Sequence, residues 1–242
     1  MTKRLFTSAL FAGLIAGLIA VLLQFLLVEP LILEGEEYET GNKSHFGGVL
    51  VLNEALEAAG GDAATEPEEE EPQNLLKRYS LAFFADFIVF VGWALVMVAG
   101  FAVADRFGHK VTLKNGLLWG IGGFVAVHMA PALGLPPELP GTPAAELELR
   151  QLWWLTTVIA TALALGFFAF GHNVLHIGIG LVLLIAPHLI GAPHLNGYAG
   201  LAPPELSGEY VARSLAVSMA IWVVLGLSAG YFWNREASAK SA

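Results

Sequence analysis

Histidines and carboxylates lie in or beside the apolar runs of this sequence, where ionisable groups are rare. Because burying such a group in hydrocarbon is costly, those present usually line a polar pathway or pair with each other. Imidazole and carboxylate ligands suit Co²⁺, Ni²⁺ or Zn²⁺, and octahedral coordination is open to the first two. The sequence therefore predicts a divalent-metal site, with six candidate ligands: Asp86, His128, Glu138, His188, His194 and Glu205.

A proline-rich turn carries some of these candidates and occurs twice. Residues 136–141, the first copy, and residues 203–208, the second copy, share the pattern Pro-Pro-Glu-Leu-x-Gly. An Ala-Pro pair precedes each copy, and an arginine, Arg150 or Arg213, follows it. Because proline cannot continue a helix, we expect the Ala-Pro at 130–131 to end a membrane helix and begin a rigid turn. Repetition of a turn with its glutamate kept indicates that the turn is functional.

The composition is that of a membrane protein. Of the 242 residues 56% are hydrophobic and only 14% are charged, and cysteine is absent, which excludes disulfides and thiolate metal sites. Six apolar runs are long enough to cross a bilayer: residues 5–28, 80–104, 116–133, 152–170, 174–190 and 211–233. The predicted class is all-α, a single membrane domain over residues 1–242. We expect a polytopic bundle of about six transmembrane helices, or five if two runs merge, with repeated hairpins joined by Pro-rich outer turns.

The polar segments predict the topology. Residues 29–78 form an acidic loop, with 47–59 as a possible short helix and 60–72 disordered. With six spans, the N-terminus, the 105–115 loop, the turn after residue 170 and the tail 234–242 share one side. That side holds seven of the twelve basic residues, namely Lys3, Arg4, Arg106, Lys110, Lys114, Arg235 and Lys240. The positive-inside rule therefore predicts an inner-membrane protein with cytoplasmic termini and an extracytoplasmic acidic loop.

Several candidates have structural alternatives. Asp86 could form a salt bridge to Arg150 or Arg78 instead of binding a cation, and a membrane histidine often only hydrogen-bonds between helices. His172 and His176, four residues apart, suit either a two-ligand metal site or the solvation of a hairpin turn. Five tryptophans near span ends are expected to be interfacial: Trp119, Trp153, Trp154, Trp222 and Trp233.

Familiar catalytic patterns are missing from the sequence. It contains no nucleotide-binding Gly-x-x-x-x-Gly-Lys-Ser/Thr loop, no His-Glu-x-x-His, no Gly-x-Ser-x-Gly and no basic patch with interleaved aromatic residues. ATP hydrolysis, zinc proteolysis, serine hydrolysis and nucleic-acid binding therefore lack support. Apolar spans, repeated turns and outward carboxylates favour permeation over catalysis.

The sequence resembles the CbtA family of bacterial cobalt transporter subunits. The likeness covers nearly the whole chain and rests on residues 116–124 (GLLWGIGGF), 130–141 (APALGLPPELPG), 150–154 (RQLWW), 190–194 (IGAPH) and 204–206 (PEL). The resemblance implies a B12-linked cobalt uptake component that works with CbtB, a small single-span protein with histidines near its end. The outer loop departs from many relatives because His45 is its only histidine.

We therefore expect a permease subunit for a divalent transition metal, with Co²⁺ as first choice and Ni²⁺ as second. The metal would be cargo, with no ATPase activity and no resident cofactor in this chain. The alternative is a non-transporting accessory or scaffold subunit of a metal transport complex. The expected partners are the metal ion, the lipid bilayer and a CbtB-like subunit, with no nucleic acid.

Overall fold

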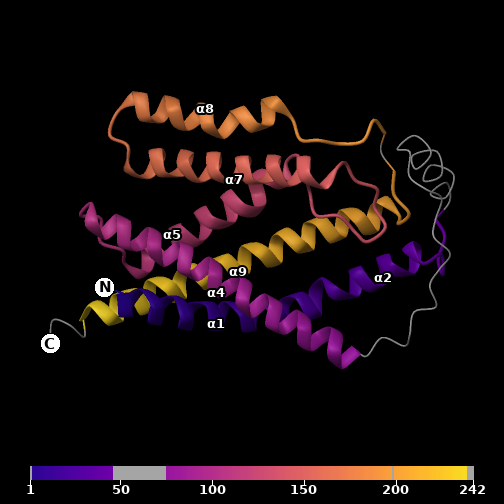
Figure 1. The fold of residues 1–242 in the computed structure, drawn as a ribbon, viewed down its shortest axis with the longest axis horizontal. Helices are drawn as coiled ribbons and strands as arrows, with labels where there is room; N and C mark the ends of the chain where they lie inside the picture. Colours follow the sequence, from indigo (N-terminus) through magenta and orange to yellow (C-terminus); the bar gives the residue numbers. More distant parts are fainter. Residues whose placement is uncertain (1, 46–74, 198, 239–242) are drawn as a thin grey trace. The chain divides into compact units, whose positions relative to one another are not determined.

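The computed structural model describes residues 2–45, 75–197 and 199–238, and all regular structure in those ranges is helical (Figure 1). The prediction of an all-α fold is confirmed. The elements are α1 (Thr2–Leu27), α2 (Glu29–Glu39), α4 (Leu75–Arg106), α5 (Leu113–Phe124), the π-helix η1 (Val125–Met129), α6 (Ala130–Ala132), α7 (Leu147–Phe170), α8 (Val174–Ile190) and α9 (Pro204–Ser238).

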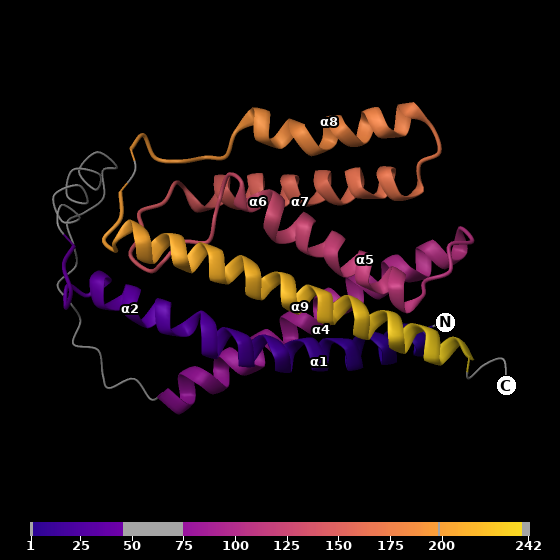
Figure 2. The same cartoon turned by 180° about the vertical axis from the view of Figure 1, so that it is seen from behind.

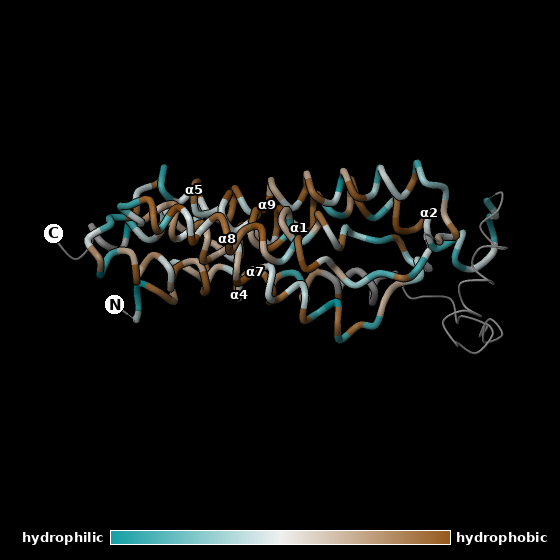
Figure 3. The backbone as a smooth tube through the Cα atoms, turned by 90° about the horizontal axis from the view of Figure 1, so that it is seen from above, coloured by the Kyte–Doolittle hydropathy of each residue, from teal (hydrophilic) through white to brown (hydrophobic). Residues whose placement is uncertain are grey.

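These helices have the length and composition of a membrane bundle. Four stretches are long and apolar enough to cross a bilayer: Thr2–Leu27, Phe83–Arg106, Leu147–Phe170 and Pro204–Arg235. Helix α8 is apolar but has 17 residues, and α5, η1 and α6 together form the third expected span. Hydrophobic stretches recur along the long helices in Figure 3. The helical membrane bundle predicted from the sequence is therefore confirmed.

The chain divides into two compact units. Unit 1 takes its described residues from Met1–Phe25, Asn74–Val125 and Ala216–Ala242, and unit 2 from Leu26–Gln73 and Ala126–Leu215. Most of α1, α4, α5 and the C-terminal part of α9 therefore belong to unit 1. Helices α2, α6, α7, α8 and the first turns of α9 belong to unit 2.

Glycines bring the helices of unit 1 close together. Gly13 of α1 faces α4, since a Cβ added there would lie 2.6 Å from the Cα of Val91. Helices α5 and α9 meet through glycines spaced four apart on each helix, namely Gly116 and Gly120 on α5, and Gly226 and Gly230 on α9. Small residues at this spacing allow membrane helices to approach closely.

Unit 2 contains the expected tight helical hairpin. Helices α7 and α8 lie side by side in both views, joined by residues 171–173 (Figures 1 and 2). Asn173 caps α8, because its Oδ1 accepts a hydrogen bond from the His176 backbone N–H at 3.0 Å. Inside the hairpin, the buried hydroxyl of Thr157 donates to the Trp153 carbonyl at 2.8 Å. The cap of the turn is thus the asparagine, and His172 is exposed.

The acidic segment begins differently from our prediction. We expected a loop from residue 29, but Glu29–Glu39 is the helix α2. Pro30 stands at its start, where proline fits a helix, and its buried Gly35 packs against Leu139 and Pro140. The helix therefore gains tertiary contacts that its acidic composition conceals. The expected short helix at 47–59 and the disordered stretch at 60–72 lie outside the described residues.

The Ala-Pro pair at 130–131 also differs from our prediction, because the helical path continues beyond it. Pro131 follows the π-helix η1 and occupies an early position of α6, where its missing N–H is tolerated. Pro187 lies inside α8, which continues to Ile190. The Ala-Pro pairs at 130–131 and 186–187 therefore belong to the last helical turns of α6 and α8, whereas the pairs at 192–193 and 202–203 are not helical.

Candidate functional site

The connection from α6 to α7, residues 133–146, contains the first motif copy and is packed against several elements of unit 2. A Cβ added to Gly134 would lie 2.7 Å from the Cβ of Ala192, so this stretch contacts the segment that follows α8. Gly141 has φ +72°, and a Cβ there would lie 3.1 Å from Glu39 of α2. Leu139 is 3% exposed. The proline-rich connection is therefore built into the unit.

Trp153 anchors this region. Its side chain is 7% exposed, and its indole Nε1–H donates to the Pro187 carbonyl at 3.1 Å. The ring also contacts His188 edge-on, with centroids 6.0 Å apart, and packs against Gly134. The interfacial role predicted for Trp153 is therefore wrong, because the indole is buried where the connection, α7 and α8 meet. Trp153 lies one helical turn after Arg150, and this spacing was the signal in the sequence that the two side chains share a face of α7.

Glu138 of the first copy forms an ion pair with Arg150. The arginine Nη2 lies 2.5 Å from the glutamate Oε2, and the two side chains are 24% and 30% exposed respectively. Arg150 stands in the first turn of α7, so the pair ties the connection to that helix. Arg150, one of the two salt-bridge partners considered for Asp86, thus pairs with Glu138.

The second copy has another structure. Pro204 begins α9, which places Glu205 in the first helical turn, where a carboxylate interacts favourably with the helix dipole. Arg213 pairs with Glu209, four residues before it, and its Nη1 donates to the Leu27 carbonyl at 3.3 Å. His194 is exposed in the non-helical segment before α9. The glutamates of the two copies therefore have different surroundings.

The six candidate ligands are distributed over both units. Five of them, His128, Glu138, His188, His194 and Glu205, belong to unit 2, whereas Asp86 belongs to unit 1. His128 lies in the π-helix η1 and is partly buried. Within the ranges that the structure describes, no group of three or more histidines, aspartates or glutamates could hold a metal ion. The arrangement instead holds individual donors against separate neighbours: Glu138 against Arg150, and His188 against Trp153.

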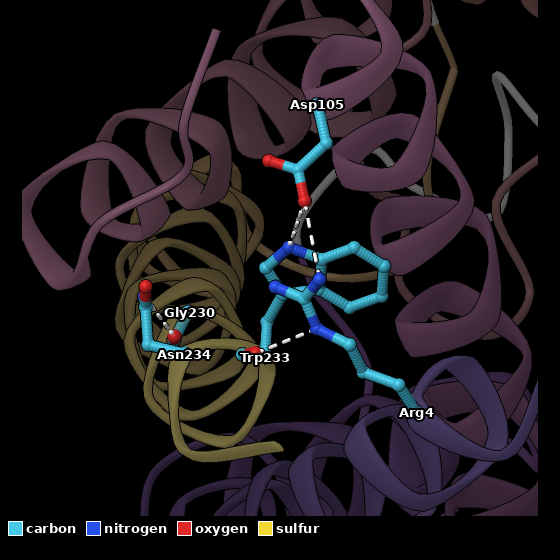
Figure 4. A network of polar contacts seen from close by, with 5 residues as sticks. All are labelled: Arg4, Asp105, Gly230, Trp233 and Asn234. Carbon is cyan, nitrogen blue, oxygen red and sulfur yellow. Dashed lines mark hydrogen bonds and ion pairs between the residues drawn. The ribbon is translucent and has the colours of Figure 1, made fainter. Parts of the chain in front are cut away.

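Unit 1 contains a polar network that our sequence reasoning missed (Figure 4). Asp105 Oδ2 accepts from the Trp233 indole at 3.0 Å and pairs with Arg4 at 3.3 Å. Arg4 also donates from Nε to the Trp233 carbonyl at 2.8 Å, with its guanidinium 3.6 Å from the ring centroid. Trp233 is fully buried, so the interfacial role predicted for it is wrong as well.

The network joins the start of α1 to the ends of α4 and α9. The N-terminus, the 105–115 loop and the C-terminal segment therefore lie at one end of unit 1, as the six-span topology expects. The sequence did contain a signal for this network, because Asp105 is a lone aspartate among the basic residues of this end.

The acidic helix α2 is partly neutralised by one lysine. Lys43 pairs with Glu37 at 2.5 Å and with Glu34 at 3.6 Å. The hydrogen bond with Glu37 raises the pKa of Lys43 above its ordinary value, because it stabilises the charged ammonium. The lysine side chain is 45% exposed, so this pair is a surface feature of α2.

Comparison with known proteins assigns the family. The model of the CbtA family, described as "Probable cobalt transporter subunit (CbtA)", matches residues 2–234. No curated protein and no solved structure matches the chain. The family match covers nearly all of α1 to α9, including both motif copies and all six candidate ligands. This chain therefore belongs to the CbtA family of probable cobalt transporter subunits.

Proposed function

We propose that this chain is the permease subunit of a Co²⁺ uptake system, with Ni²⁺ as second choice, in the inner membrane with both termini cytoplasmic. The observation that carries the proposal is the family match over residues 2–234, in a chain that folds as an apolar helical bundle. Five of the six expected ligands also belong to one compact unit. The metal is the cargo, the chain has no catalytic activity, and no resident cofactor takes part.

The donor chemistry favours Co²⁺ or Ni²⁺ over Mg²⁺ and Cu⁺. The sequence offers imidazoles and carboxylates but no thiolate, and imidazole disfavours the hard Mg²⁺ ion, whereas Cu⁺ prefers sulfur ligands. Because Glu138 and His188 are held by different neighbours, we propose that the ion keeps most of its water and exchanges one or two protein ligands at a time. His128, His194 and Glu205, which belong to the same unit as Glu138 and His188, would be further steps of that path, and Asp86 of unit 1 stays a separate candidate ligand.

Glu138 would accept the ion by exchanging partners. Its carboxylate pairs with Arg150 at a position where both side chains are about one quarter exposed, so a hydrated cation can reach it from water. The cation would displace the guanidinium, which then repels the ion and favours its onward movement. A path of weak, separate donors permits the ion to leave as well as to enter.

The membrane potential can supply the energy for uptake. Moving one elementary charge through 100 mV yields about 2.3 kcal/mol, and hence about 4.6 kcal/mol for a divalent cation. A negative cell interior therefore favours entry without nucleotide hydrolysis.

Proteoliposomes with an imposed potential test the proposal. We expect radioactive cobalt to accumulate with the unmodified chain, and accumulation to be lost in Glu138→Gln and in His188→Ala. Glu209→Gln is the matched control, because it breaks the Arg213–Glu209 pair, which is not among the candidate ligands. Competition with Ni²⁺ and Zn²⁺ measures the metal preference. Uptake that stays at the control level in both candidate variants would contradict the ligand assignment.

An accessory role is the second candidate, and the word "subunit" in the family description favours it. In that case the chain alone would not move cobalt, and transport would appear when the small CbtB-like partner is reconstituted with it. Entry without the partner supports the permease, and absence of entry in both preparations favours a scaffold.

A further inference from the structure

A groove between α1 and α9 in unit 1 has the features of a lipid site. The groove has a volume of about 370 Å³ and is lined by Thr7, Ser8, Phe11, Phe232 and Arg235. This volume falls within the range of about 300 to 1,000 Å³ that is typical of small-molecule sites. Two aromatic rings form its apolar wall, since Phe11 and Phe232 stack with centroids 5.3 Å apart.

A buried hydroxyl in the groove lacks a hydrogen-bond partner. Ser8 is fully buried, and its Oγ forms no hydrogen bond. The neighbouring Thr7 hydroxyl, in contrast, donates to the Lys3 carbonyl at 2.9 Å, as helical threonines commonly do. A buried polar atom without a partner is unfavourable, because it has lost its hydrogen bonds to water without replacement. The groove therefore offers a ligand one unused donor at its base.

Arg235 supplies a positive charge beside this apolar wall. It stands in the last turn of α9 and is exposed, and in the described part of the chain no carboxylate forms an ion pair with it. The Arg4 side chain nearby is already engaged by Asp105 and Trp233, as Figure 4 shows. Arg235 is therefore the arginine of this groove that can bind an anion, and a long arginine stem allows the guanidinium to extend from an apolar surface towards lipid headgroups.

We propose that the α1–α9 groove binds an anionic phospholipid from the leaflet at this end of unit 1. The phosphodiester lies on Arg235, an ester carbonyl accepts from Ser8, and the upper part of an acyl chain packs on Phe11 and Phe232. The exposed side chains of Phe6 and Leu10, at 58% and 46%, continue the apolar surface outside the groove. Such a lipid would join the beginning of α1 to the end of α9 beside the Arg4–Asp105–Trp233 network.

A similar groove lies between α1 and α4. It has a volume of about 340 Å³ and is lined by Thr2, Leu5, Ala99, Ala102, Val103 and Arg106. None of these described lining residues carries a buried side-chain atom that lacks a partner. Of these two grooves, the α1–α9 groove is the one that combines a positive charge, an aromatic wall and an unused hydrogen-bond donor.

Retention of phosphatidylglycerol by the purified full-length chain tests the site. Native mass spectrometry would compare its half-saturation with that of phosphatidylcholine with the same acyl chains. Arg235→Gln is expected to weaken phosphatidylglycerol retention about fivefold, the factor for one basic residue at an anionic surface. Lys110→Gln removes the same charge at the same end but outside the groove, so it should leave retention unchanged. Inorganic phosphate added in excess should not displace the lipid.

The position of the bound lipid is tested by phosphatidylglycerol with a photoreactive group high in its acyl chain. Crosslinks are expected on the peptides that contain Phe11 and Phe232, and they should decrease in Arg235→Gln. Equal retention of both lipids, equal retention in Arg235→Gln and the unmodified chain, or displacement by phosphate would overturn the proposal. So would crosslinks spread evenly over other lipid-exposed helices such as α8.

Discussion

The two copies of the Pro-Pro-Glu-Leu-x-Gly motif have nearly the same sequence and different structures. In the first copy, residues 136–141, the chain is not helical, and Glu138 pairs with Arg150, twelve residues later. In the second copy, residues 203–208, the chain already forms the first turns of α9, and Arg213 pairs with Glu209. The repeat of sequence is therefore not a repeat of structure.

One position explains much of the difference. The residue after the shared leucine is Pro140 in the first copy and Ser207 in the second. The Ser207 backbone N–H donates to the Pro203 carbonyl at 3.1 Å and closes the first turn of α9. Proline has no N–H, and its ring collides with the carbonyl four residues before it. Pro140 therefore prevents the first copy from beginning a helix as the second copy does.

The second difference lies three residues after each arginine. Trp153 follows Arg150 and is buried against the proline-rich connection, whereas Ala216 follows Arg213 and is exposed. The first copy thus has an anchor that fixes a non-helical connection, and the second relies on a continuous helix. A shared motif is informative about chemistry only when its packing partners are repeated too.

Of the changes considered, removal of the Trp153 anchor should cause the largest loss of stability. Trp153→Ala is expected to lower the free energy of unfolding by about 3–5 kcal/mol, because it empties a buried site and leaves the Pro187 carbonyl without its donor. Unfolding in detergent, followed by tryptophan fluorescence or circular dichroism, measures the change. Trp154→Ala, on the same helix but only partly buried, is the matched control and should cost much less.

Making the second copy resemble the first should shorten α9. Ser207→Pro removes the hydrogen bond to the Pro203 carbonyl and is expected to cost up to about 3 kcal/mol, with the helix beginning after residue 207. Hydrogen exchange of the peptide that contains residues 203–213 reports the shift. Unchanged protection there would contradict the role that we assign to Pro140.

The glycines that end the two copies should respond in opposite directions to alanine. Gly141 has φ +72° and close neighbours, so Gly141→Ala is expected to destabilise the protein by about 1–2 kcal/mol. Gly208 is helical and has no atom within 4 Å of its added Cβ, so Gly208→Ala should stabilise α9 by up to about 1 kcal/mol. Equal shifts of the two unfolding midpoints would show that the copies share one conformation after all.

Breaking the ion pairs should have the smallest effects. Arg150→Gln is expected to cost about 1 kcal/mol, because Glu138 and Arg150 are less exposed than an ordinary surface pair. Arg213→Gln, at a pair whose side chains are 41% and 49% exposed, should cost about 0.5 kcal/mol or less. High salt should reduce the stability loss of both variants, and it should reduce the loss in Arg213→Gln more, because that pair is more exposed to solvent. A larger loss at Arg213 would reverse the order that burial predicts.

The sequence by itself determined the fold class and the apolar helical segments. The free energies of transfer from water to lipid add up over successive residues. An apolar run of sufficient length therefore specifies a membrane helix, whatever its neighbours in the fold are. The expected run 174–190 coincides with α8, and the motif residues were sufficient to indicate the family. The sequence also predicted a turn in the first copy, but it placed the end of the helix at the Ala-Pro pair 130–131, whereas α6 continues to Ala132.

Only the tertiary structure decided which side chains meet. The sequence suggested Arg150 or Arg78 as partners of Asp86 and the membrane interface as the place of Trp153 and Trp233. In the structure Arg150 pairs with Glu138 and both indoles are buried. Helix α2 shows the same limit, since its acidic residues predict a loop while Leu31 and Gly35 find buried contacts. Such contacts join residues far apart in the chain, and their energies depend on geometry that no local pattern contains.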